Sequence, residues 1–203
     1  MSIFYHLTVV FLSIFERKLL IMKRKDFLLT TLAATPVVAF SQLKTQTGKK
    51  KLPFLVKSGK SRFGEQIKFM GVHPNDLKIS GKDTNGQLSM FEYTGYGTTG
   101  PVLHVHFKQD EIFYVAEGEY RFVVGAETHT LTQGDTIFLP RNIPHTWIQL
   151  TEKGKLIYML QPSGKIEAFF EKMSSLAKPP TEEEFQTISL EHEMKNVGPV
   201  LTL

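Results

Sequence analysis

Between residues 66 and 161 the chain is a series of short runs rich in β-branched and aromatic residues, most of them separated by Gly or Asn. This pattern constrains the fold more than any other feature. Many short strands at close spacing, with no helical period between them, predict an all-β sandwich or barrel. We find no internal repeat, so we expect one barrel. The expected strands are residues 66–70, 87–94, 102–107, 111–116, 120–124, 128–131, 136–139, 145–150 and 156–161.

Length and charge agree with a single domain that carries appendages. The chain has 203 residues and is 41% hydrophobic, enough for one full core. The net charge of the chain is +4. Residues 1–51 hold nine Lys or Arg and two acidic residues. Residues 52–203 hold 15 basic and 18 acidic residues, a net charge of −3. Because the basicity belongs to the start of the chain, we expect no nucleic-acid partner.

Histidines and a glutamate are spaced in a way that suits a metal ion. His104 and His106 are two residues apart on an expected strand, so their imidazoles project from the same face. The polar residues 107–110 turn the chain and bring Glu111 beside them, and His145 supplies a third nitrogen. Such a set suits one divalent Fe, Mn, Co, Ni, Cu or Zn ion and leaves two positions open on a six-coordinate ion.

The order of these residues resembles the two signature motifs of the cupin superfamily. The chain reads His-x-His, four residues, Glu111, six residues, Gly118, and later Gly134, five residues, Pro140, and His145. Three positions depart from the pattern, with Thr98 and Asn142 where glycine is usual and Gln149 in place of the closing asparagine. The resemblance implies a cupin double-stranded β-helix, that is a jelly-roll barrel, of the single-domain type similar to quercetin dioxygenases. It also implies a homodimer.

Other residues on the expected inner faces are candidates for a cavity or for contacts near the metal. Trp147 and Gln149 share a strand face with His145, and Gln149 needs a hydrogen-bond partner there, which a contact or a water near the metal would supply. Core packing is the alternative for Trp147. The same two roles, cavity wall or core, are open to Phe91, Tyr93, Phe113 and Tyr158. His73, His129 and His192 match no motif position, so we interpret them as solvent-facing or structural.

After Pro162 the hydrophobic period changes to that of helices. Ile166, Phe169, Phe170, Met173 and Ala177 predict one helix, capped by Ser163 or Gly164. Thr181 and Glu184 form a capping box for a second helix whose last turn runs towards Asn196 and Gly198. We expect both helices to pack outside the barrel.

The start of the chain resembles an export signal. Lys23, Arg24 and Lys25 precede an apolar run that ends in Ala39-Phe40-Ser41, a cleavage site that would release Gln42. Counted from Met1 this signal has 41 residues, and counted from Met22 it has 20, the usual length, so Met22 is a candidate start. Neither apolar run is long enough to span a bilayer, and we expect an exported, periplasmic or secreted protein, with an uncleaved anchor as the alternative. The predicted parts are a leader at residues 1–41, a linker at 42–60, the barrel at 61–161 and a C-terminal helical extension at 162–203.

Three functions fit these observations. The first is a metal-dependent dioxygenase acting on an aromatic or enolic molecule, in which Glu111 also takes a substrate proton as general base. The second is an isomerase, decarboxylase or lyase acting on a small polar molecule. Such an enzyme needs cationic anchors, typically arginines, and the arginines after residue 51 are only Arg62, Arg121 and Arg141. The third is a non-catalytic module that binds a metal or ligand.

Overall fold

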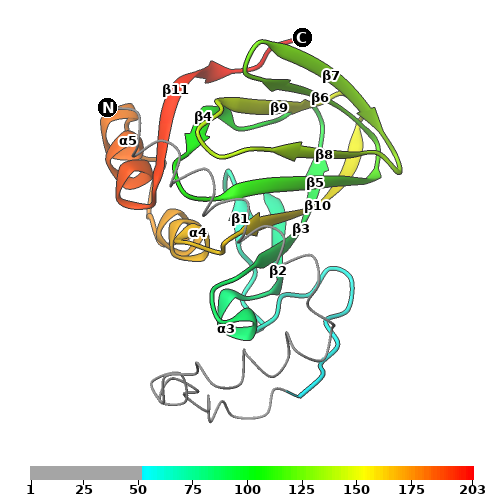
Figure 1. Cartoon of the computed structure of the whole chain (residues 1–203), viewed down its shortest axis with the longest axis vertical. Helices are drawn as coiled ribbons and strands as arrows, with labels where there is room; N and C mark the ends of the chain where they lie inside the picture. The colour runs from blue at the N-terminus through cyan, green and yellow to red at the C-terminus, as the bar shows by residue number, and fades with distance from the viewer. Residues whose placement is uncertain (1–51) are drawn as a thin grey trace, which may run out of the picture. The chain divides into compact units, whose positions relative to one another are not determined.

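Two antiparallel sheets face each other in the computed structural model, which describes residues 52–203 (Figure 1). The first sheet holds, in spatial order, β1 (Lys68–Phe69), β2 (His73–Ile79), β3 (Ser89–Tyr96), β10 (Lys153–Gln161), β5 (Asp110–Glu117) and β8 (Thr136–Leu139). The second holds β11 (Met194–Val200), β4 (Val102–His106), β9 (His145–Gln149), β6 (Glu119–Val124) and β7 (Glu127–Thr132). The predicted all-β jelly-roll fold is confirmed.

Alternation of buried and exposed residues explains why these segments form strands. In β10 every second residue from Gly154 to Leu160 is buried, and β6 buries Tyr120 and Phe122 in the same way. Successive side chains of a strand point to opposite faces, so each strand contributes one apolar face to the space between the sheets. The resulting core is mainly aromatic, and each large side chain there stabilises the fold by about 1.5–3 kcal/mol.

Two turns show how the cupin-like motifs work in this chain. Gly118, between β5 and β6, has φ of +89°, and a Cβ there would lie 2.9 Å from the carbonyl oxygen of Lys153. Only glycine combines easy access to a positive φ with the absence of a Cβ. Asn142, before β9, has φ of +65°, and asparagine is among the residues that tolerate this left-handed conformation. The departure from glycine at position 142 therefore leaves the turn intact.

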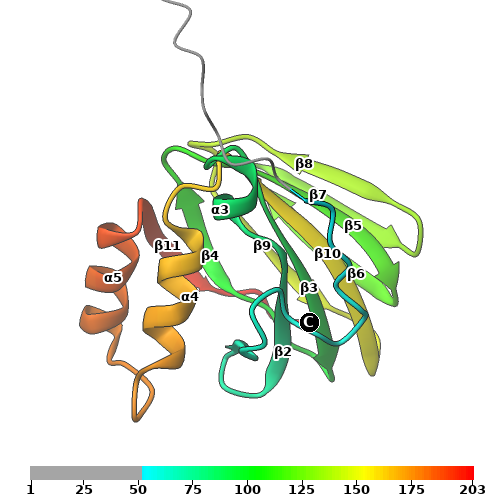
Figure 2. The same cartoon turned by 90° about the horizontal axis from the view of Figure 1, so that it is seen from below.

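Both predicted C-terminal helices are present. α4 (Ile166–Ser174) and α5 (Glu182–Glu191) lie side by side on one flank of the barrel, next to β11 (Figures 1 and 2). The capping box of Thr181 and Glu184 is confirmed at the start of α5. The predicted cap of α4 is wrong, because Lys165 occupies the N-cap position without a side-chain bond, while the Ser163 hydroxyl bonds that of Ser89 at 2.6 Å.

Three elements escaped the sequence analysis. β2, α3 (Gly81–Thr84) and β11 were not predicted, and the tail after α5 is a strand rather than an extension of the helix. β2 contains Pro74, Asn75 and Asp76, which are residues typical of turns, and β11 contains Gly198 and Pro199. Pairing with β3 and with β4 overrides these local preferences. Ala177, assigned to the first helix, lies beyond its end at Ser174.

The segment before the barrel is only partly described. The predicted leader, its cleavage site and the linker up to residue 51 lie outside the described residues. Residues 57–60, assigned to the linker, are hydrogen-bonded to the barrel: the Gly59 N–H donates to Glu92 at 2.8 Å, and Lys78 Nζ donates to the carbonyl oxygen of Lys60 at 2.8 Å. None of the helices within residues 52–203 has the length and apolar character needed to cross a membrane.

Candidate metal centre

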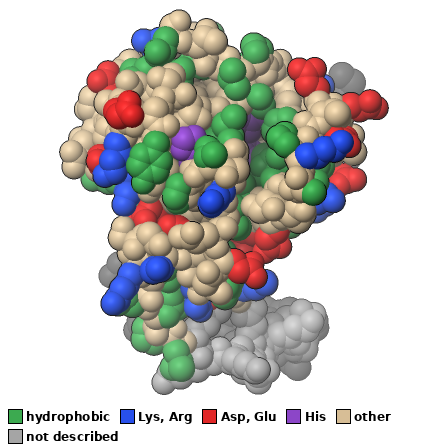
Figure 3. Space-filling view, turned by 180° about the vertical axis from the view of Figure 1, so that it is seen from behind, with side chains coloured by type: hydrophobic (Ala, Val, Ile, Leu, Met, Phe, Trp, Pro, Cys, Tyr) green, Lys and Arg blue, Asp and Glu red, His purple; other side chains and the backbone are tan. Residues whose placement is uncertain are grey.

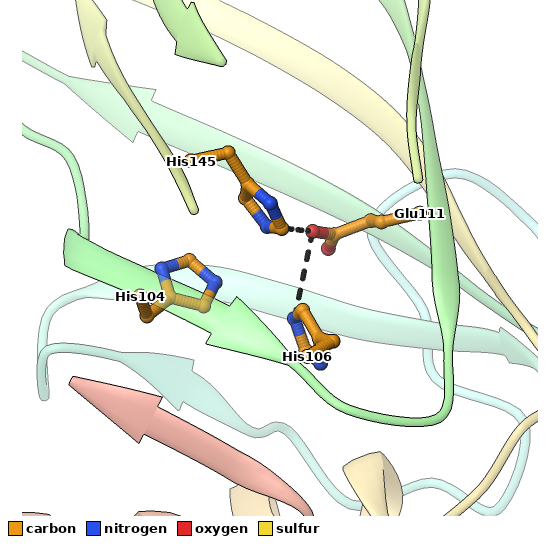
Figure 4. A group of neighbouring side chains, drawn as sticks. All are labelled: His104, His106, Glu111 and His145. Carbon is orange, nitrogen blue, oxygen red and sulfur yellow. Dashed lines mark hydrogen bonds and ion pairs between the residues drawn. The ribbon is translucent and has the colours of Figure 1, made fainter. Parts of the chain in front are cut away.

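His104, His106, Glu111 and His145 converge between the two sheets (Figure 4). His104 and His106 lie on the same face of β4, and His145 begins β9 opposite His104 in the strand register. Glu111 comes from β5 in the other sheet. Each residue offers one ligand atom, and these four atoms lie within 4.8 Å of one another. The structure thus brings together the full set that the sequence singled out.

Backbone hydrogen bonds orient two of the imidazoles. Nδ1 of His104 lies 2.9 Å from the carbonyl oxygen of Val102, and Nδ1 of His145 lies 3.0 Å from that of Ile143. A carbonyl oxygen only accepts, so both Nδ1 atoms carry the proton and donate. The Nε2 lone pairs are then free for a metal ion.

Burial keeps His104 and His106 neutral. Desolvation, together with the neighbouring imidazoles of His145 and His106, lowers the pKa of His104 to about 3. Desolvation and His145 also lower the pKa of His106 to about 3. At neutral pH both side chains therefore present uncharged nitrogen atoms, which is the form that binds metals.

The donor set fits a divalent transition metal. Nε2 of His145 lies 3.1 Å from Glu111 Oε2, and Nε2 of His106 lies 3.6 Å from the same oxygen. Two ligand atoms at ~2.1 Å from one ion and at a right angle to each other are ~3.0 Å apart. Nδ1 of His145 already bonds the Ile143 carbonyl oxygen, so Nε2 is the atom that would bind an ion, and it faces a carboxylate oxygen that would bind the same ion.

Gln109 is a contact of the site that the sequence analysis missed. Its Nε2 donates to Glu193 at 3.2 Å, while its buried Oε1 and the buried Nδ1 of His106 have no hydrogen-bond partner. The Gln109 amide raises the pKa of His106 against the larger effect of burial. Its only sequence signal is its place among the four residues between His106 and Glu111.

A cavity of about 180 Å³ is lined by three of the four residues, namely His104, His106 and Glu111. Figure 3 shows this side of the molecule hollowed between hydrophobic side chains, with histidine visible inside the hollow. Its walls are largely apolar and include Phe169, Phe170 and Met173 of α4 and Phe185 of α5. The helices that we expected to pack outside the barrel therefore also form part of the cavity wall.

Four of the six predicted cavity residues line this space, namely Tyr93, Phe113, Trp147 and Tyr158. Phe91 and Gln149 do not. Phe91 is core, with its ring stacked on that of Tyr158 at 5.1 Å. Gln149 is satisfied away from the four ligands, since its Oε1 accepts from Tyr120 at 3.3 Å and its Nε2 donates to the carbonyl oxygen of Thr151 at 2.8 Å.

Within residues 52–203, the remaining histidines and the arginines lie outside the cavity wall. His73 is buried and accepts the Tyr96 N–H at 3.3 Å, which is a structural role. His129 is exposed, and His192 bonds the carbonyl oxygen of Ile188. Arg62 pairs with Asp83 and Arg141 with Asp110, and among the described residues that line the cavity Lys68 is the one cation.

Comparison with known proteins places these features in a family. Residues 91–160 match the family model of the cupin domain. The chain is 26% identical over 109 residues to quercetin 2,3-dioxygenase of Bacillus subtilis, a match that covers 54% of this chain and 31% of that protein. It is 36% identical over 44 residues to the uncharacterised protein MJ1618 of Methanocaldococcus jannaschii, covering 22% of this chain and 35% of the relative. The matches therefore span about a third of the length of both relatives.

Solved structures include similar barrels. An RmlC-like cupin from Shewanella frigidimarina has 22% sequence identity and a TM-score of 0.43, with 53% of this chain and 92% of that chain covered. KdgF from a Halomonas species has 19% identity and a TM-score of 0.42, with 46% and 81% covered.

Proposed function

The chain belongs to the cupin superfamily, and from that premise we propose that it is a metal-dependent dioxygenase acting on a small aromatic or enolic molecule. One observation carries the proposal: His104, His106 and Glu111 of the four-residue cluster line a cavity whose walls are mainly aromatic and aliphatic. The partial similarity to a quercetin 2,3-dioxygenase supports it. The lack of a lining arginine among the described residues disfavours a polar acid or sugar phosphate as substrate.

His104, His106, His145 and Glu111 would hold the ion. A transition metal ion, when bound, supplies Lewis-acid polarisation and redox access to molecular oxygen. Glu111 is 6% exposed, so a substrate hydroxyl that reaches its carboxylate does so away from bulk water and transfers its proton to Oε1 or Oε2. Phe113, Trp147 and Tyr158 hold the substrate ring by apolar contact and exclude water from the reacting oxygen atoms.

Oxygen consumption tests this function. Protein reconstituted separately with Fe, Mn, Co, Ni, Cu or Zn is supplied with flavonols and catechols, and oxygen uptake is followed. At least one redox-active metal should give uptake, with both atoms of labelled oxygen in the product. The matched control is His145→Ala, which should give none. No uptake with any metal would refute the proposal and favour a binding module.

We also propose that the protein is exported and forms a homodimer. The basic and apolar pattern of residues 22–41 supports export, and amino-terminal sequencing of the mature protein should begin at Gln42. Membership of a superfamily whose barrels often pair supports the dimer, and light scattering should give twice the mass of the processed chain. An intact leader or a monomeric mass would contradict the respective proposal.

A further inference from the structure

Asn75 lines the cavity and has an unused hydrogen-bond donor. The residue lies on β2, is fully buried and belongs to the same cavity wall as Glu111. Its Oδ1 accepts the Tyr158 hydroxyl at 2.9 Å, but its Nδ2 has no partner. A buried donor without an acceptor costs about 1–3 kcal/mol, so a ligand that supplies the acceptor recovers that free energy.

The unused donor does not depend on how the amide is oriented. Two hydrogens on Nδ2 and one on the Tyr158 hydroxyl are available, and the contact between the two side chains uses one of them. If the amide were turned over, Nδ2 would donate to the tyrosine oxygen and the tyrosine hydrogen would be free. The pair of Asn75 and Tyr158 therefore keeps a donor in either orientation.

Tyr158 holds this pair in a fixed place. Its ring stacks on Phe91 at 5.1 Å and on Phe113 at 5.2 Å, so the hydroxyl cannot swing away from Asn75 without breaking both stacks. The donor is thus preorganised, which reduces the entropy lost when a ligand binds.

Asn75 and Glu111 line the same cavity from different strands of one sheet. Tyr158, which bonds Asn75, is the register partner of Phe113, and Leu160 is the register partner of Glu111, two residues away on both strands. A planar ligand in this cavity can therefore place one polar end at Glu111 and the other at Asn75.

Tyr93 offers a further unpaired donor of the cavity wall, but it lies elsewhere. Its hydroxyl has no partner, yet a Cβ on Gly95 would collide with both this hydroxyl and Oε1 of Gln149. The tyrosine hydroxyl thus lies by Gly95 and Gln149, and Gln149 does not line the cavity. Asn75 is the donor that a ligand at Glu111 reaches.

We propose that Asn75 donates a hydrogen bond from Nδ2 to a neutral acceptor oxygen of the substrate. The cavity then selects planar aromatic molecules with a hydroxyl at one end, facing Glu111, and a carbonyl or ether oxygen about one ring away. Its volume of about 180 Å³ equals that of roughly six waters in the liquid, hence room for a ligand built on one aromatic ring. This inference rests on the proposed function only in taking the cavity as the substrate site.

Two catechols that differ in one acceptor test the proposal. The zinc-loaded protein is titrated under argon with 3,4-dihydroxyacetophenone, which has a carbonyl opposite the hydroxyls, and with 4-ethylcatechol, which has none. Trp147 is the only tryptophan of the chain and lines the cavity, so its fluorescence reports binding. The wild type should prefer the ketone, and Asn75→Leu should reduce the ratio of the two dissociation constants about tenfold. The two catechols differ in acidity, but this difference affects the ratio equally in the wild type and in the variant, so the change in the ratio does not depend on it.

Asn196→Leu is the matched control. Asn196 also lines the cavity, but its Nδ2 already donates to Ser189 at 3.1 Å. This variant should leave the ratio at its wild-type value, even if both affinities change. An unchanged ratio in Asn75→Leu, or equal effects of the two substitutions, would overturn the proposal.

A measurement on the wild type covers the case in which Asn75→Leu does not fold. The carbonyl of 3,4-dihydroxyacetophenone, labelled with carbon-13, should show a lower infrared stretching frequency when bound than in an apolar solvent. A frequency equal to that in the apolar solvent, or failure of both probes to bind, would refute the role of Asn75. Zinc does not support oxygen chemistry, so absence of turnover with every metal would defeat the dioxygenase proposal and leave this result standing.

Discussion

At the scale of single residues, the ligand set is readable because each of its members has a geometric signal. The period of a strand puts His104 and His106 on one face, and the motif spacing adds Glu111 and His145. The hydrogen bond between Nδ1 of His145 and the carbonyl oxygen of Ile143 leaves Nε2 as the atom that would bind a metal ion.

Removing one imidazole should empty the site. We expect His145→Ala to lower bound metal, measured by elemental analysis of protein purified from its native compartment, by at least tenfold, because one of four ligands is lost. His129→Ala is the matched control, since His129 is exposed and lies outside the cluster. Equal metal content in the wild type and His145→Ala would show that the site is assigned to the wrong residues.

The roles of three residues could not be predicted from the sequence, namely Asn75, Gln109 and Gln149. Each is a buried amide whose role depends on which partner the fold supplies. Gln149 was expected near the metal because it shares a face with His145, but Tyr120 and Thr151 satisfy it. Asn75 looked like a turn residue, and its unused donor exists only because Tyr158 holds the other end of the amide. No pattern in one sequence carries that information.

At the scale of elements, the strands with clear alternation were predictable and those dominated by cross-strand pairing were not. In β10 and β6 burial alternates with a period of two. β2 and β11 contain proline, asparagine or glycine, and they form strands because neighbouring strands pair with them. Because β2 carries Asn75, the missed strand also concealed part of the cavity wall.

A buried carboxylate joins the segment before the barrel to β3. Burial raises the pKa of Glu92, but the Gly59 N–H and the Lys78 ammonium together lower it below its ordinary value of 4.5. The charged form is thus stabilised by folding. This contribution is fully present above pH 4.5 and is lost as the pH falls through the lower pKa of the folded state.

Glu92→Gln should therefore lower the free energy of unfolding by about 1–2 kcal/mol at neutral pH. The difference from the wild type should shrink below pH 4.5. Urea unfolding at several pH values measures it, and hydrogen exchange at the Gly59 amide should quicken. Glu127→Gln is the control, because the Glu127 side chain is 77% exposed. A difference that stays constant from pH 7 to pH 3 would contradict this account.

At the scale of the whole molecule, an ion bound by these four residues would link the two sheets. β4 and β9 supply the histidines from one sheet, and β5 supplies Glu111 from the other. A ligand that binds only the folded state stabilises it by mass action, and the four atoms are assembled only in that state.

Metal should therefore raise the melting temperature. At a free zinc concentration a hundredfold above its dissociation constant, the gain is about 2.7 kcal/mol, or roughly 5–10 °C for a domain of this size. Thermal melts with zinc and with a chelator measure the shift, and His145→Ala should not show it. A shift of the same size in that variant would indicate binding elsewhere.

β4 pairs with β11, a strand that is synthesised much later than β4. Asn196 is opposite His104 and Met194 is opposite His106, while β4 meets β9 through a single register pair. β11 comes after every other described element. Until residues 194–200 have been made, the strand that carries His104 and His106 has an open edge, so the pairing of that edge waits for β11.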